Sequence, residues 1–117
     1  MIIKKGCNFD CDFNDGKLSI LLKGEIDHHS AVSVRSAIDE KLYELRPSSL
    51  VIDLSRIEFM DSSGLGLIMG RYALMQKLGG EFSLANPSAR VERIFELSGL
   101  GRIIKIENTE KKEEDTK

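Results

Sequence analysis

The stretch LVIDLSRIEFMDSSGLG, residues 50–66, decides the fold because a strand pattern gives way to a helix pattern within it. Residues 50–54 form a nearly continuous apolar run, which is typical of a strand covered on both faces. Asp61-Ser62 offers two suitable helix N-caps, and Gly79-Gly80 is a signal for a helix end. The sequence therefore predicts a buried strand followed by a helix from about Ser62 to Leu78.

A β-hairpin is predicted before this stretch. Phe9, Cys11 and Phe13 alternate with polar residues, as they would on a half-buried strand. Residues 14–16, Asn-Asp-Gly, tolerate the positive φ angles that a tight turn requires. The next run, 17–23, alternates in the same way through Leu18, Ile20 and Leu22.

Between the hairpin and the buried strand, the apolar period becomes helical from Ser30 onward. Asp27 and Ser30 are both suitable caps for this helix, and Pro47 ends it. Its apolar face consists of Ala31, Val34, Ile38, Leu42 and Leu45, and its polar face carries Arg35, Asp39, Glu40 and Glu44.

Three elements follow the central helix. Residues 81–85 predict a short strand, and Asn86-Pro87 is a favourable cap and first-turn pair for a third helix that ends at Gly99. Residues 102–106 predict a last strand. The resulting order, β-β-α-β-α-β-α-β, predicts an α/β fold with a small mixed sheet flanked by helices.

Composition fits one domain of 1–106 followed by a charged tail, 107–117, that we expect to be disordered. The formal net charge of −2 provides no positive excess for phosphates, which disfavours a nucleic-acid role. No apolar run approaches the roughly 20 residues of a membrane span, and no signal-peptide pattern opens the sequence, so we expect a cytoplasmic protein. Cys7 and Cys11 have no second pair downstream, so neither a zinc site nor a disulfide framework is indicated. We expect no metal and no cofactor.

The junction at residues 59–66 is the first candidate site. The simple explanation of Asp61-Ser62-Ser63 is a helix start, since Asp61 and Ser62 are both suitable N-caps. However, helical spacing places Ser62, Gly66 and Gly70 in one stripe, and a glycine inside a helix costs roughly 1 kcal/mol relative to alanine. Close approach of another backbone explains such a stripe, whether from the protein's own fold or from a partner. The apolar stripe expected to face the sheet consists of Leu65, Ile68, Tyr72 and Met75.

The segment Gly24-Glu25-Ile26-Asp27-His28-His29-Ser30 resembles a second strand-to-helix junction. Adjacent strands of one sheet would bring it beside Ser62. His28 and His29 are neighbours in sequence, so their side chains diverge and do not have the spacing of metal ligands.

Two enzymatic or ligand-binding alternatives are weaker. A serine hydrolase would use Ser62 with His28 or His29 and Asp27 or Asp53, but Met60 stands where the nucleophile elbow requires its first glycine. A nucleotide-binding loop would require Gly-Lys-Ser or Gly-Lys-Thr, whereas Gly64-Leu65-Gly66 continues into leucine.

Together these segments resemble the STAS domain of bacterial anti-sigma factor antagonists, and most of all its sporulation branch. The likeness extends from the first hairpin to Ile106. Asp-Ser-Ser-Gly-Leu-Gly is specific to the antagonists, whereas Asp-His-His and Gly-Arg-Tyr favour the sporulation branch over the general-stress branch. The segments that carry the likeness are residues 24–31, 59–66, 70–72, 79–80 and 97–100.

The resemblance implies a partner-switching regulator rather than an enzyme. The unphosphorylated protein is expected to bind an anti-sigma factor, which is also a serine kinase, and so to release a sigma factor, here sigma F. Phosphorylation of Ser62 by this kinase turns the antagonist off, and a PP2C-type phosphatase reverses it. The expected partner-binding residues are Asp27, His28, Ser30, Asp61, Ser62, Ser63, Gly64, Gly66 and Gly70.

Overall fold

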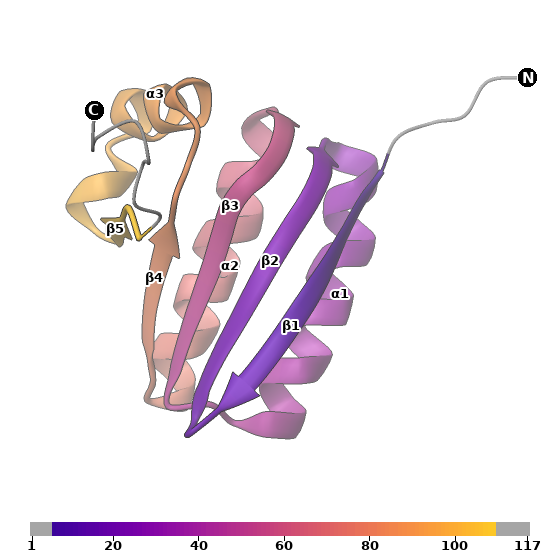
Figure 1. Ribbon diagram of the computed structural model, residues 1–117, viewed down its shortest axis with the longest axis vertical. Helices are drawn as coiled ribbons and strands as arrows, with labels where there is room; N and C mark the ends of the chain where they lie inside the picture. Colours follow the sequence, from indigo (N-terminus) through magenta and orange to yellow (C-terminus); the bar gives the residue numbers. More distant parts are fainter. Residues whose placement is uncertain (1–5, 110–117) are drawn as a thin grey trace, which may run out of the picture.

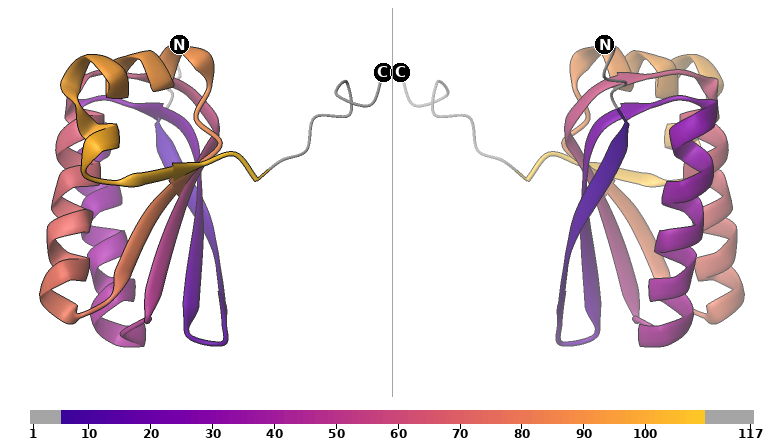
Figure 2. Two further views of the ribbon diagram at one scale, coloured as in Figure 1. Left: turned by 90° about the vertical axis from the view of Figure 1, so that its left-hand side faces the viewer. Right: turned by 90° about the vertical axis from the view of Figure 1, so that its right-hand side faces the viewer.

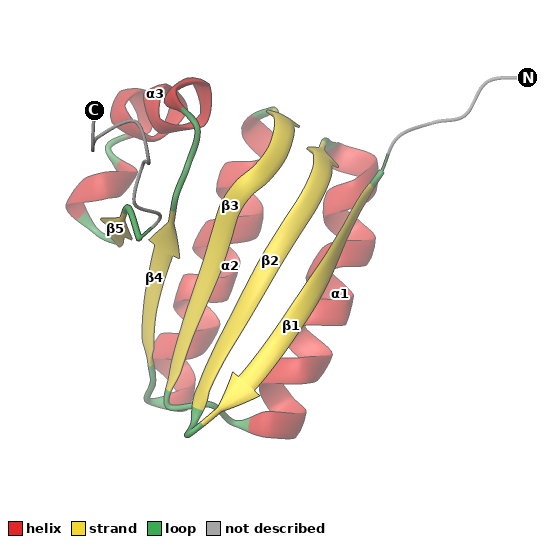
Figure 3. Cartoon of the chain, in the orientation of Figure 1, coloured by secondary structure: helices red, strands yellow, loops and turns green. Residues whose placement is uncertain are grey.

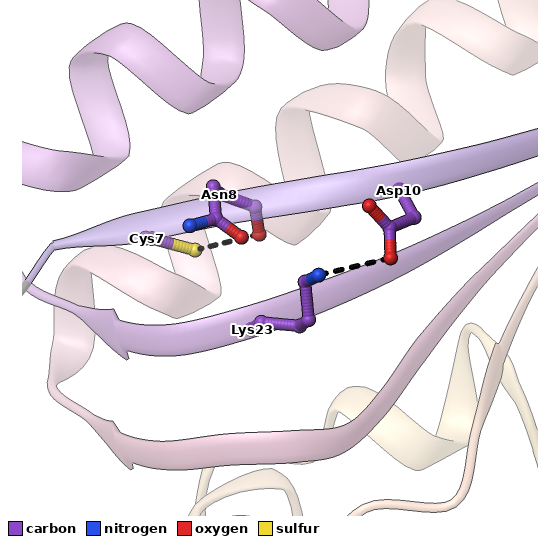
Figure 4. A network of polar contacts seen from close by, with 4 residues as sticks. All are labelled: Cys7, Asn8, Asp10 and Lys23. Atoms are coloured by element: carbon purple, nitrogen blue, oxygen red, sulfur yellow. Dashed lines mark hydrogen bonds and ion pairs between the residues drawn. The ribbon is translucent and has the colours of Figure 1, made fainter.

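A two-stranded hairpin opens the part of the chain that the computed structural model describes, residues 6–109. Strand β1, Cys7–Asn14, pairs antiparallel with β2, Lys17–Ile26. Asp15 and Gly16 between them both have positive φ angles, 54° and 79°, which is the geometry of a tight hairpin turn. Lys23 on β2 reaches across to Asp10 on β1, with 2.9 Å between Nζ and Oδ2 (Figure 4). The hairpin predicted from the sequence is therefore confirmed.

The rest of the chain alternates between helices and strands (Figure 3). In chain order it forms α1 (His28–Leu45), β3 (Ser49–Met60), α2 (Ser62–Leu78), β4 (Glu81–Ala85), α3 (Ala89–Ser98), a single 3₁₀ turn (Leu100–Arg102) and β5 (Lys105–Glu107). The predicted order of elements is confirmed. Helix α2 and strand β4 have the predicted bounds, and α1 begins two residues earlier than predicted.

The five strands form one mixed sheet in the order β1-β2-β3-β4-β5 (Figure 1). All pairs except β1–β2 are parallel. Helices α1 and α2 lie together on one face of this sheet, and α3 lies across its end (Figure 2). This follows from the preferred right-handed crossover: the chain moves from β2 to β3 to β4 in one direction, so both helices land on the same side.

The core lies between the sheet and these two helices. On β3 the buried side chains alternate, with Leu50, Ile52 and Leu54 fully buried and Val51 and Asp53 only half-buried. The expectation that this strand is covered on both faces is therefore wrong. The apolar run could not reveal this, because a single valine on the second face is enough to make the run nearly continuous.

Strand β1 is less buried than its alternation predicts. Cys7 and Phe9 are half-buried against the core, but Cys11 is exposed and Phe13 is 43% exposed. The strand lies at the edge of the sheet, and in residues 6–109 no strand pairs with its outer side.

Two predictions near the C-terminal end are corrected. The N-cap of α3 is Ser88, whose side chain accepts a hydrogen bond from the Val91 N–H, and not Asn86. Asn86 has a positive φ of 57°, and its amide is bonded instead to Asp53 and Thr109. The last strand is also shorter than predicted and shifted toward the C-terminus, because a 3₁₀ turn occupies its expected start. Of the expected tail, Glu107 belongs to β5 and Thr109 is bonded to Asn86, whereas residues 110–117 lie outside the described residues.

At the amino edge of the parallel strands, Ser48 joins three connections. Its backbone N–H donates to the Gly16 carbonyl over 2.8 Å, and its hydroxyl donates to the same oxygen over 3.0 Å. Its own carbonyl accepts from the Glu81 N–H over 2.9 Å. The hairpin turn, the α1–β3 loop and the α2–β4 loop are therefore tied together at one point.

Candidate functional site

The two strand-to-helix junctions lie side by side at the carboxyl edge of the sheet. Ile26 and Met60 are paired at the ends of β2 and β3, and each strand continues directly into a helix. One backbone hydrogen bond joins the junctions, from the Asp61 N–H to the Ile26 carbonyl over 3.1 Å. The structure thus brings together the two segments that the sequence singles out, and helices α1 and α2 start from the same level.

Asp27 and Ser30 form a capping box at the start of α1. The Asp27 carboxylate accepts hydrogen bonds from the N–H groups of Ser30 and His29 over 2.9 and 3.0 Å, and the Asp27 N–H donates to the Ser30 hydroxyl over 3.0 Å. The hydrogen bond from the Ser30 N–H is the main reason that the pKa of Asp27 lies below its ordinary value. Both residues are therefore occupied in holding the helix start. His28 and His29 are exposed beside them, with their ring centres 4.1 Å apart, so the expectation that these neighbouring side chains diverge is wrong.

Asp61 is the N-cap of α2, and its carboxylate accepts a hydrogen bond from the Ser63 N–H over 2.8 Å. Ser62 is the first residue of the helix, and its side chain is exposed. The Ser63 side chain is only half-exposed. Of the two serines, Ser62 presents its hydroxyl more openly to another protein.

The glycines of α2 have different surroundings. Gly64 is buried, and a Cβ at this position would collide with the Met60 side chain. At Gly66 and Gly70, by contrast, a Cβ would meet no atom within 4 Å. The protein's own packing therefore requires a glycine at 64 but explains neither Gly66 nor Gly70.

A cleft of about 280 Å³ lies between the first halves of α1 and α2. Its lining includes His28, Val32 and Arg35 from α1 and Ser63, Gly66 and Leu67 from α2. Sequence reasoning missed Val32 and assigned Arg35 to the polar outer face of its helix. Both follow His28 at helical spacing, at four and seven residues, so the stripe was present in the sequence.

The apolar stripe predicted for α2 is correct in part. Ile68 and Met75 are fully buried against the core, but Leu65 and Tyr72 are only half-buried. Arg71 takes a buried place on this helix, and Asp39, expected on the outer face of α1, turns toward it.

The site does not assemble a hydrolytic triad within the described residues. No hydrogen bond links Ser62 to His28 or His29, and the Asp27 carboxylate is bound to backbone N–H groups. Asp53 is bonded to the Ser55 N–H and to Asn86. In residues 6–109 no three His, Cys, Asp or Glu side chains lie together in a way that would hold a metal ion, and no helix there is long and apolar enough to cross a membrane.

Comparison with known proteins gives a consistent result. The family model described as STAS domain matches residues 8–113. The chain is 38% identical over 101 residues to the anti-sigma F factor antagonist of Paenibacillus polymyxa, covering 86% of each chain. It is also 38% identical over 101 residues to the anti-sigma-B factor antagonist of Bacillus subtilis, covering 85% of this chain and 89% of that one. Among solved structures, the anti-sigma factor antagonist SpoIIAA in its unphosphorylated form superposes with a TM-score of 0.74 at 31% identity, covering 93% of this chain and 92% of that one.

Proposed function

The chain belongs to the STAS domain family and is an anti-sigma factor antagonist, and from this premise we propose that it is a phosphorylation-controlled switch for sigma F. When Ser62 is unmodified, the protein binds an anti-sigma factor that is also a serine kinase, and the sigma factor is released. Phosphorylation of Ser62 ends this binding, and a PP2C-type phosphatase restores it.

The observation that carries the proposal is the position of Ser62. Its exposed hydroxyl lies at the first position of α2, next to the α1 junction and at the head of a helix face with open glycines at 66 and 70. A kinase can therefore reach the hydroxyl, and a partner that covers this face must also cover Ser62. The relative SpoIIAA has been solved in an unphosphorylated and in a phosphorylated form, which supports phosphate as a modification of this fold.

The phosphate acts at the interface rather than on the fold. It adds about −1.5 to −2 charges at neutral pH. The Asp61 carboxylate already accepts a hydrogen bond from the Ser63 N–H, and a second anion at Ser62 is tolerated at this positive end of the helix dipole. A bulky dianion at this point obstructs close approach of a partner and repels its acidic groups.

Sigma F is favoured over sigma B by two short motifs. The relatives themselves do not separate the branches, since the F-type and B-type antagonists are equally identical to this chain. Asp27-His28-His29 and Gly70-Arg71-Tyr72 resemble the sporulation branch. A general-stress antagonist is the alternative, and comparison of affinities for an anti-sigma F and an anti-sigma-B factor distinguishes the two.

The test of the proposal is phosphorylation followed by site mapping. The purified protein is incubated with the anti-sigma factor of the same organism and ATP, and the modified residue is located by mass spectrometry. We expect one phosphate, on Ser62, with Ser63→Ala still modified and Ser62→Ala unmodified. Phosphate on Ser63, or equally tight binding of the phosphorylated and unmodified protein, would contradict the proposal.

A further inference from the structure

The cleft between α1 and α2 has a cation at one side and no anion in its lining. Arg35 is exposed and forms no ion pair or hydrogen bond with another residue of the described range 6–109. None of the residues that line the cleft is acidic, although the chain as a whole carries a formal charge of −2. The cleft therefore presents an unbalanced positive charge on a mildly acidic protein.

The natural partner of Arg35 within the fold is already taken. Asp39 lies one turn further along α1, at the spacing that allows an ion pair. Its carboxylate instead contacts Arg71 of α2, with 2.8 Å between Oδ1 and Nε and 3.3 Å between Oδ2 and the second guanidinium nitrogen. Asp39 is thus committed to the buried arginine.

The charge of Arg35 also acts against this buried pair. Burial is the main cause of the lowered pKa of Arg71, and repulsion by the Arg35 charge lowers it further. A cation that weakens the adjacent ion pair and has no partner within residues 6–109 contributes little to folding. Its place at the cleft is better explained by something that binds there.

The shape of the cleft fits a protruding side chain from another protein. Val32 is 54% exposed, which leaves an apolar surface one turn from Arg35. On the opposite side Gly66 has no side chain and no neighbour near its Cβ position, so another backbone can come close. Apolar contact beside a single charge favours an amphipathic protein segment over a small anion.

We propose that the α1–α2 cleft receives an acidic side chain of the anti-sigma factor, whose carboxylate pairs with Arg35 while a neighbouring apolar side chain packs on Val32. This rests on the function proposed above and adds the chemistry of the contact. It also gives the Ser62 phosphate a defined target, because a dianion on the same helix face as Gly66 opposes the approach of a partner carboxylate.

Calorimetric titration with the purified anti-sigma factor of the same organism tests the pairing. Arg35→Gln should weaken binding about tenfold, and Arg35→Glu about a hundredfold, since an ion pair is lost in the first and replaced by repulsion in the second. The matched control is Arg56→Gln, which removes an exposed arginine of β3 that does not line the cleft and should change the affinity less than about twofold. Thermal unfolding of each variant is measured in parallel, and Arg35→Gln should be as stable as the wild type.

The outcomes separate this inference from the function on which it rests. If the wild type binds and both Arg35 variants bind with the same affinity, the acidic contact is overturned. The antagonist function is then unaffected. Equal loss in Arg35→Gln and Arg56→Gln also overturns it, because the effect is then one of net charge. Absence of wild-type binding overturns the proposed function itself. The selective loss in the Arg35 variants, with unchanged stability, supports the pairing.

Discussion

The Arg71 guanidinium on α2 lies 2.8 Å from the Asp39 carboxylate on α1, and this ion pair joins the two helices that flank the candidate cleft. The Nε–H is not aimed at the nearer carboxylate oxygen, so the contact is an ion pair rather than a well-formed hydrogen bond. The Nη1 nitrogen of the guanidinium donates to the Leu67 carbonyl over 3.0 Å, while Nη2 is the nitrogen that donates to Asp39. Arg71 therefore sets how α1 and α2 lie relative to each other, behind the surface that we propose binds the partner.

Removing the Arg71 side chain should destabilise the protein. Arg71→Ala leaves a cavity and an unpaired Asp39, but this carboxylate is 28% exposed and can recover water. We expect the free energy of unfolding to fall by about 2–3 kcal/mol, which is at or below the lower end of the roughly 3–5 kcal/mol that breaking a fully buried pair costs. Urea denaturation measures this loss of unfolding free energy. A double-mutant cycle with Asp39→Ala should give a coupling energy of at least about 0.5 kcal/mol between the two side chains. Additive effects would show that the pair makes no specific contribution.

Gly64 and Gly66, two residues apart on α2, should respond oppositely to replacement by alanine. Gly66→Ala should raise the free energy of unfolding by about 0.5–1 kcal/mol, because its Cβ meets nothing and alanine favours helix. The same methyl group should weaken partner binding about tenfold, since it lies where we propose a backbone approaches.

Gly64→Ala is the matched comparison. Its Cβ collides with Met60, so the free energy of unfolding should fall by about 1–3 kcal/mol. Thermal unfolding and calorimetric binding are measured for both variants. A stabilised Gly66→Ala protein that still binds at full affinity would remove this helix face from the interface.

An acidic residue at position 62 should imitate the off state without unfolding the domain. Ser62 is exposed and begins α2, where a carboxylate is compatible with the helix dipole. The free energy of unfolding of Ser62→Asp should therefore lie within about 0.5 kcal/mol of the wild-type value, yet the variant should bind the anti-sigma factor weakly. Ser62→Ala, which keeps the neutral surface, should bind well. Loss of structure in Ser62→Asp, seen by circular dichroism, would attribute the off state to the fold instead.

The cap of α1 should give a pH-dependent contribution to stability. The pKa of Asp27 is lowered in the folded protein from its ordinary value of 3.8, chiefly by the hydrogen bond from the Ser30 N–H. A carboxyl group with a lowered folded-state pKa stabilises fully above its unfolded pKa and loses that contribution as pH falls through the folded pKa.

Asp27→Asn is the direct comparison, because asparagine keeps a capping oxygen but has no charge to titrate. The wild type should be the more stable of the two above about pH 5, and the difference should shrink as pH falls below about 4. Urea denaturation between pH 3 and 7 measures it. A difference that is constant across this range would contradict the contribution of the ionised carboxylate.

The two cysteines should differ in reactivity. Burial raises the pKa of Cys7 to about 11, whereas Cys11 is exposed on the same strand. At pH 8 only about one Cys7 in a thousand is then the reactive thiolate. The Cys7 sulfur lies against the backbone of Asn8 near the start of β1, at 3.8 Å from its carbonyl oxygen (Figure 4). A disulfide-exchange reagent should modify one thiol per molecule quickly and the second only slowly or after unfolding, and Cys11→Ser should abolish the fast phase.

Local sequence signals predicted those elements whose ends are marked by a capping residue or a glycine. Helix α2 begins and ends where Asp61 and Gly79 indicate, because a cap and a left-handed glycine decide a helix end almost without tertiary context. The meeting of the two junctions was also predictable, since parallel neighbouring strands end at the same edge. The family resemblance, which named Ser62, rests on these same segments.

The missed features depend on contacts that only the folded chain reveals. Asn86 has the residue type of a cap, but it is used to bind Asp53 and Thr109, which come from distant parts of the chain. Asp39 follows the polar pattern of α1 and yet turns toward Arg71, because the two helices pack beside each other. The open second face of the sheet likewise follows from both crossovers having the same hand, which no window of sequence contains.

The hydrogen bonds of Ser48 show that the loops are held together at one edge of the sheet, whereas the candidate binding site lies at the other. Ser48 binds three connections at the amino edge, far along the strands from the junctions at Asp27 and Asp61. Residues at the carboxyl edge can therefore be replaced without breaking the hydrogen bonds that Ser48 forms. We expect grafts of residues 27–35 and 61–66 from another antagonist to transfer its choice of partner while the recipient still folds, so that recognition can diversify among relatives on an unchanged frame.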